Sequence, residues 1–175
     1  MSNKTQFSSS AGTDFVVLCN IYTDRWEMIE LLRSTYARID LGALGENIET
    51  LKRLAGTPVM AVVKADAYGH GMKQAAGEAI KHGVHYFAVA TPDEAMEFKA
   101  YYPEEEVLIL SSAQPQAFEA LIGAGVIMTA YTPEDIFSLQ RCADKVGKPA
   151  RFGVTKEMKE KQKAAKKAAK EAEAK

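Results

Sequence analysis

The chain has 175 residues, 47% of them hydrophobic, with a net charge of −1 and a mean hydropathy of −0.19. A chain of this length and composition can bury a core and form one soluble globular domain. The near-zero charge gives no reason to expect a nucleic-acid or membrane partner, and no apolar run approaches the roughly 18 residues of a membrane span. There is no convincing signal peptide, and Cys19 and Cys142 fit no ligand or redox spacing. We therefore predict free thiols and a cytoplasmic protein.

Residues 1–35 are predicted to form an N-terminal extension that is partly disordered. Residues 1–14 are rich in Ser, Thr, Asn and Gly. The apolar run Phe15–Tyr22 indicates a strand, and Asp24 is a candidate N-cap for a helix that ends near Arg33. This segment carries no motif that indicates a function.

The next segment predicts a strand followed by a helix. The alternation over Tyr36–Leu41 is typical of a short strand. From Gly42 the apolar residues recur at helical spacing, and Gly56 is placed to end the helix. The apolar positions of this helix are Leu44, Ile48, Leu51 and Leu54.

The stretch Pro58–Gly71, PVMAVVKADAYGHG, has the clearest chemical content. Its first six residues are mostly apolar and predict a buried strand, because they present no polar face. Lys64 follows this strand directly, and the small and polar residues after it, with two glycines, predict a strand-to-helix loop. The pattern therefore places a lysine at the carboxyl end of a buried strand, where α/β sheets carry their active sites.

Strands and helices alternate four times between residues 58 and 146, with short connections. Helices are expected over residues 72–82, 92–101, 114–123 and 133–146, and further strands over 86–90, 107–110, 126–129 and 150–154. The sequences Thr91-Pro92 and Thr132-Pro133 predict helix starts with capping boxes. This order predicts an α/β fold over residues 36–154, a partial (β/α) barrel of four to five TIM-like units. A partial barrel of this kind leaves two unpaired strand edges and an uncovered barrel interior.

Residues 155–175 are almost all Lys, Glu and Ala and predict a charged C-terminal helix. The helix has no apolar stripe beyond alanine, so we expect a solvated extension rather than a partner-binding element.

Several side chains near the central stretch can carry chemistry, and each has a plainer interpretation. Lys64 is either a solvated strand end or, because burial lowers the pKa of a lysine ammonium, an amine able to form a Schiff base with an aldehyde. Tyr68 either binds a phosphate oxygen or packs on the loop, and His70 either orients a ring or phosphate or is an ordinary loop histidine. The pair His82 and His85 has no carboxylate or cysteine at ligand spacing, so a metal site is not expected.

The motif VVKADAYGHG resembles the pyridoxal-phosphate signature of the alanine racemase family, which usually has Asn at the position of Asp66. Upstream, YARIDLGALGENIETLKRL resembles the opening strand and helix of that family. Downstream, GVHYFAVATPDEAMEFK and VLILSSAQPQ resemble its next strands and helices. The resemblance covers about residues 35–149.

The resemblance implies a fold-type III barrel with a second, mainly β domain, which works as a homodimer and interconverts L- and D-alanine for cell-wall precursor supply. It implies pyridoxal 5′-phosphate as cofactor, Lys64 as the Schiff-base lysine and the base on the D-alanine face, and Tyr68 as a hydroxyl that binds the cofactor phosphate. It also implies that the strand at Tyr36–Leu41 lies outside the barrel, so that PVMAVVK is the first barrel strand.

After Ala150 the chain departs from the family pattern. The strand resembling HLKIDTGMGR is missing before Arg151, and so are the family's second-domain base and its phosphate-binding serine-glycine region. We therefore predict that this chain alone binds the cofactor weakly and does not racemise alanine efficiently. Two alternatives are a pyridoxal-phosphate-binding homeostasis protein of the same fold type and a non-enzymatic half-barrel that pairs with another chain.

Overall fold

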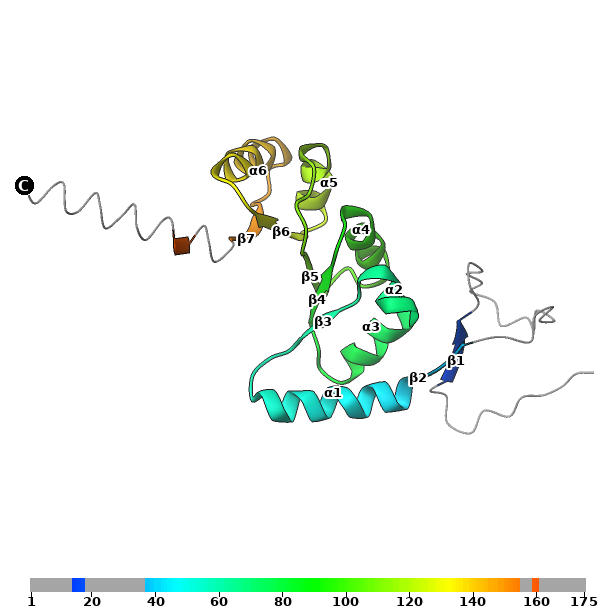
Figure 1. Ribbon diagram of the computed structural model, residues 1–175. Helices are drawn as coiled ribbons and strands as arrows, with labels where there is room; N and C mark the ends of the chain where they lie inside the picture. Colours follow the sequence, from blue (N-terminus) through cyan, green and yellow to red (C-terminus); the bar gives the residue numbers. More distant parts are fainter. Residues whose placement is uncertain (1–13, 18–36, 155–158, 161–175) are drawn as a thin grey trace, which may run out of the picture.

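The structure is a computed structural model that describes residues 14–17, 37–154 and 159–160 (Figure 1). Most of the predicted extension and most of the charged tail lie outside these residues. In the extension, β1 (Asp14–Val17) begins one residue before the predicted strand and pairs antiparallel with β2 (Ala37–Asp40). This pair is separate from the main sheet, so the strand predicted over residues 36–41 does lie outside the barrel.

The main sheet has five parallel strands whose spatial order follows the sequence, β3-β4-β5-β6-β7. These strands are β3 (Met60–Val62), β4 (Tyr86–Val89), β5 (Glu106–Ile109), β6 (Ile127–Ala130) and β7 (Arg151–Val154). Each strand from β3 to β6 is followed by helical structure. Within the described residues β3 and β7 are unpaired edges, so the sheet is not closed into a barrel. The alternation of parallel strands and helices with open edges confirms the predicted α/β partial barrel.

Apart from two larger differences, the ends of the helices lie within one residue of the predicted ranges. They are α1 (Leu41–Ala55), α3 (Met72–Lys81), α4 (Pro92–Tyr101), α5 (Phe118–Gly123) and α6 (Pro133–Val146). The helix predicted over 114–123 is divided into a 3-10 turn (η1, Pro115–Ala117) and α5. The loop predicted after Lys64 is instead a short helical segment, α2 (Lys64–Gly69), whose backbone is described below.

Side-chain caps explain where α1, α4 and α6 begin. α1 begins at Leu41 rather than at the predicted Gly42, because the Asp40 carboxylate accepts the Ala43 N–H at 2.9 Å. Both predicted capping boxes are present, at Thr91 for α4 and at Thr132 for α6.

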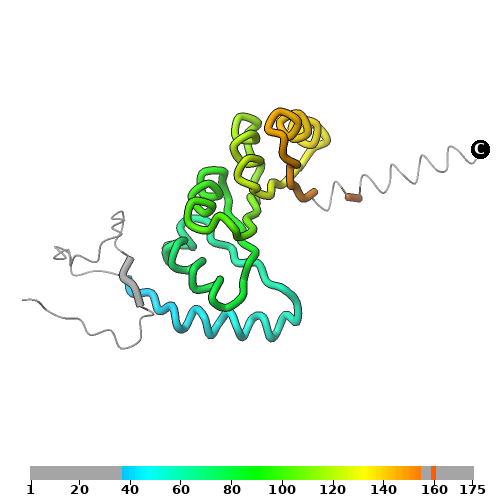
Figure 2. The backbone as a smooth tube through the Cα atoms, turned by 180° about the vertical axis from the view of Figure 1, so that it is seen from behind, coloured from blue at the N-terminus to red at the C-terminus, as the bar shows by residue number. Residues whose placement is uncertain are grey.

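The core lies between the sheet and the helices on one of its faces. The strand residues that point toward these helices are fully buried: Phe87, Val89, Val107, Ile109, Met128 and Ala130. On the opposite face large apolar side chains are exposed, as at Met60, which is 45% accessible, and at Val62 and Leu110. In both views α1 lies beside α3, while α5 and α6 lie together at the far end of the sheet (Figures 1 and 2). This open face is the barrel interior, and the described residues do not cover it.

The ladder between β5 and β6 is the weakest in the sheet. Its register has a single pair, Leu108 opposite Ile127, whereas the other three parallel pairings have three or four. A side-chain hydrogen bond supplements it, since the Thr129 hydroxyl donates to the Ile109 carbonyl at 2.8 Å. The sheet therefore has a seam between β5 and β6.

Candidate functional site

Lys64 stands at the carboxyl end of β3. The strand is fixed there by the Val63 N–H, which donates to the Ala88 carbonyl at 2.8 Å, and by the burial of the Val63 side chain. Lys64 itself is half-buried, and its Nζ lies 6.0 Å from the centroid of the Tyr68 ring. Tyr68 is 61% accessible. The structure thus brings the two predicted cofactor-binding side chains together at the open end of the first barrel strand.

The backbone between these two residues is left-handed. Ala65, Asp66, Ala67 and Tyr68 have φ between 50° and 58° and ψ between 36° and 50°. For a residue with a Cβ this conformation costs about 1–2 kcal/mol. Four such residues in a row persist only where surrounding contacts determine the backbone, a situation found at functional sites. The prediction of a glycine-dependent loop is therefore incomplete: Gly69 and Gly71 do have positive φ, but they follow the left-handed turn instead of forming it.

Glu94 holds the start of this turn from the next loop. Its Oε1 accepts the Ala65 N–H at 2.6 Å, while its Oε2 accepts the Ala90 and Thr91 N–H groups at 2.7 and 3.1 Å. Burial alone would raise the pKa of Glu94, but the three backbone donors and the nearby Lys64 charge outweigh it, so the pKa is lowered. A single carboxylate therefore joins the ends of β3 and β4 and carries its negative charge toward Lys64.

Asp66 and His70 hold the other end of the turn. The Asp66 Oδ1 accepts the N–H of Met72, the first residue of α3, at 2.6 Å, which supplies the cap that Gly71 lacks. The His70 Nδ1 lies 2.9 Å from the Ala67 carbonyl, so it donates to the turn. In the structure His70 is thus engaged with the backbone that carries Tyr68.

The neighbouring strand ends present hydroxyl groups that are already bonded to backbone. The Ser111 hydroxyl donates to the Ala90 carbonyl, and the Tyr131 hydroxyl donates to the Leu110 carbonyl at 2.5 Å. Neither residue was singled out from the sequence, because each lies alone after a strand without a motif. Both stiffen the edge of the sheet on which Lys64 lies.

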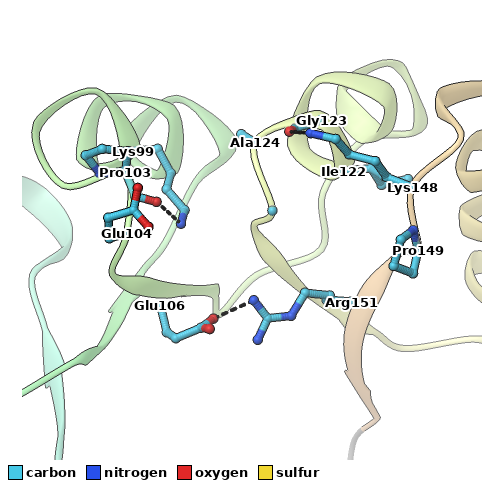
Figure 3. Close-up of a pocket in the computed structure, with 11 residues that line it drawn as sticks. Lys99, Pro103, Glu104, Glu106, Ile122, Gly123, Ala124, Lys148, Pro149 and Arg151 are labelled. Carbon is cyan, nitrogen blue, oxygen red and sulfur yellow. Dashed lines mark hydrogen bonds and ion pairs between the residues drawn. The ribbon is translucent and has the colours of Figure 1, made fainter.

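A cavity of about 360 Å³ lies at the opposite, amino end of the strands (Figure 3). Its cations are bonded to the protein. The Lys99 Nζ donates to the Pro103 and Glu105 carbonyls, the Lys148 Nζ donates to the Gly123 carbonyl, and Arg151 pairs with Glu106 at 2.6 Å. Burial lowers the pKa of Lys99, although the charge of Glu106 opposes this. We interpret these contacts as structural ties between α4, α5 and the starts of β5 and β7.

The remaining histidines bond to carboxylates between elements. His82 contacts Glu49 at 3.0 Å and the buried Glu78 at 3.3 Å, while His85 contacts Glu105 at 2.9 Å. Residues 14–17, 37–154 and 159–160 contain no group of His, Cys, Asp and Glu side chains arranged to hold a metal ion. In the same ranges, no helix has the length and apolar character needed to cross a membrane.

Comparison with known proteins gives a consistent result. Residues 39–158 match the family model of the alanine racemase N-terminal domain. Alanine racemase 2 of Caldanaerobacter subterraneus subsp. tengcongensis is 37% identical over 73% of this chain. The solved alanine racemase of Clostridium difficile 630 is 32% identical, with a TM-score of 0.61 over 64% of this chain. The histidine racemase of Leuconostoc mesenteroides, at 23% identity and a TM-score of 0.60, shares the fold. The chain spans about a third of the length of these relatives, 33%, 30% and 30% in turn.

Proposed function

This chain belongs to the alanine racemase N-terminal domain family, and we propose that it binds pyridoxal 5′-phosphate through Lys64 and Tyr68. The observation that carries the proposal is the contact between the half-buried Lys64 and the exposed Tyr68 across a strained turn at a strand's carboxyl end. An amine and a phenol this close to each other suit a cofactor that carries an aldehyde and a phosphate group.

Lys64 is proposed to bond to the aldehyde carbon of the cofactor through its Nζ, with the loss of one water molecule. Tyr68 is proposed to donate its phenolic hydrogen to a phosphate oxygen. When bound, the cofactor draws electrons from the substrate and makes the amino-acid Cα–H acidic. As a free amine beside the bound substrate, Lys64 would take or return that proton on one face.

Racemisation of alanine is the reaction that the resemblance implies, and it needs a second base on the opposite face. We propose Lys64 for one face and assign no residue of this chain to the other. The chain alone is therefore expected to take up the cofactor weakly and to interconvert L- and D-alanine slowly or not at all. Alanine as substrate and a homodimeric state remain predictions from the family.

The test traps the cofactor on the protein. The full chain is incubated with pyridoxal 5′-phosphate, reduced with borohydride and mapped by peptide mass spectrometry. We expect preferential labelling of Lys64, together with a visible absorbance band that is lost in Lys64→Ala. Lys73→Ala is the matched control, because the Lys73 Nζ also lies over a tyrosine ring, at 5.0 Å from the centroid of Tyr101.

Labelling spread evenly over the lysines, or an absorbance band unchanged in Lys64→Ala, would refute the cofactor proposal. A second measurement follows the conversion of L-alanine to D-alanine by the pure chain. Rapid conversion that depends on Lys64 would show that this chain holds a complete site and would overturn the expectation of weak activity.

A further inference from the structure

Two loops of the sheet use the same local design with side chains of different length. After β4, Thr91 caps α4 and Glu94 closes the capping box; after β6, Thr132 caps α6 and Asp135 closes the box. The Asp135 Oδ2 accepts the Tyr131 and Thr132 N–H groups, both at 2.9 Å. An aspartate at this position is therefore long enough to complete the box.

Glu94 is one methylene longer than the box requires, and its second oxygen bonds to a residue outside its own loop. That oxygen, Oε1, accepts the Ala65 N–H at 2.6 Å, across 29 residues of sequence. By contrast, the contacts of Asp135 within the described residues stay in its own loop and helix start. The extra length of Glu94 thus allows a hydrogen bond between the segments that follow β3 and β4, and helix capping does not explain this bond.

The residue that donates this hydrogen bond begins the left-handed turn. Ala65 is the first of the four residues with positive φ and follows Lys64 directly. A charge-assisted hydrogen bond from this N–H to a fixed carboxylate holds the peptide plane between Lys64 and Ala65. It therefore acts on the direction in which both Lys64 and the turn leave β3.

We propose that Glu94 is a positioning residue that fixes the turn carrying Lys64 and Tyr68, in addition to capping α4. The expected effect of Glu94 on cofactor binding rests on the proposed function. The geometric part of the proposal, the hold on Ala65, stands on the free protein alone.

The experiment uses Glu94→Asp, which shortens the side chain to the length that completes the box at Asp135. The matched control is Asp135→Glu, which lengthens the equivalent side chain away from the lysine. Amide hydrogen exchange by NMR is measured for Ala65 and Thr91 in the free full-length chain. Labelling of Lys64 by pyridoxal 5′-phosphate and borohydride is measured on the same proteins.

In Glu94→Asp we expect the Ala65 amide to exchange about 10- to 100-fold faster, as for the loss of a hydrogen bond to a charged group. The Thr91 amide and the thermal midpoint should stay close to those of the unchanged protein, because the box is retained. Labelling of Lys64 should fall several-fold, and Asp135→Glu should alter neither readout.

Unchanged exchange at Ala65 in Glu94→Asp would overturn the hold on the turn, whatever the cofactor does. Faster exchange at Ala65 with unchanged labelling of Lys64 would overturn the positioning role. If the unchanged protein is not labelled at Lys64 at all, the proposed function fails, and the exchange at Ala65 still decides whether Glu94 holds the turn.

Discussion

The left-handed turn makes a prediction that runs against ordinary experience with helices. Replacing Ala65 by glycine should stabilise the protein, although an alanine-to-glycine change in a right-handed helix destabilises it. Ala65 has φ 50° and ψ 50° and is exposed, so the change removes little packing. Relief of the left-handed strain is worth about 1–2 kcal/mol, and the greater freedom of glycine in the unfolded chain costs about 0.4–1 kcal/mol. The free energy of unfolding should therefore not fall, and should rise by up to about 1.6 kcal/mol.

Urea unfolding followed by far-ultraviolet circular dichroism measures this change, with two controls. Ala100→Gly lies on the exposed side of the right-handed α4 and should lower the free energy of unfolding by about 0.5–1 kcal/mol. Gly56→Ala places a Cβ at φ 60°, with no atom within 4 Å of it, and should destabilise by strain alone. If Ala65→Gly destabilises the protein as much as Ala100→Gly does, the turn is not strained as we argue.

Three further predictions concern the core, a cap and a carboxylate. Phe98→Ala should lower the free energy of unfolding by about 3–5 kcal/mol in urea titrations, because Phe98 is fully buried with its ring centroid 4.8 Å from that of Phe87; a loss under 1 kcal/mol would contradict this packing. Thr132→Ala should cost about 1 kcal/mol in the same assay through the lost N-cap of α6, and a neutral result would show that the cap is not formed. The pKa of Glu49 is lowered, first by its hydrogen bond to His82, so its stabilising contribution is complete above its ordinary range and is lost as pH falls below about 4.5. Thermal midpoints of Glu49→Gln should therefore fall less steeply on acidification than those of the unchanged protein, and parallel curves would exclude this linkage.

Local signals in the sequence were enough for most of the fold. Thr91-Pro92 and Thr132-Pro133 fixed two helix starts, because N-capping depends on residues within one turn. The boundaries of β5 and β6 moved by a single residue, since an apolar run does not say which of its members makes the ladder bonds. Lys64 and Tyr68 were each predicted to bind the cofactor, which stays a prediction; the structure places the Lys64 Nζ 6.0 Å from the centroid of the Tyr68 ring.

The backbone of the site was not predictable in the same way. The turn is bonded to Glu94 from the next loop and, through Asp66, to the Met72 N–H, and neither contact follows from local propensity. The capping box predicted after Thr91-Pro92 accounts for one oxygen of Glu94 only, and nothing in the local sequence indicates that the other oxygen accepts the Ala65 N–H. Long-range hydrogen bonds of this kind leave no periodic pattern to read.

The short ladder between β5 and β6 leads us to expect that the sheet opens in two parts. Lys64, Tyr68 and Glu94 all belong to the β3–β5 unit, while β6, α6 and β7 form the other. Partial opening should begin where the ladder has one pair, since sub-globular units separate at their least bonded boundary. We expect hydrogen exchange to be fastest along β6 and β7 and slowest in β4, so that the proposed cofactor turn stays folded through fluctuations that release the last βα unit.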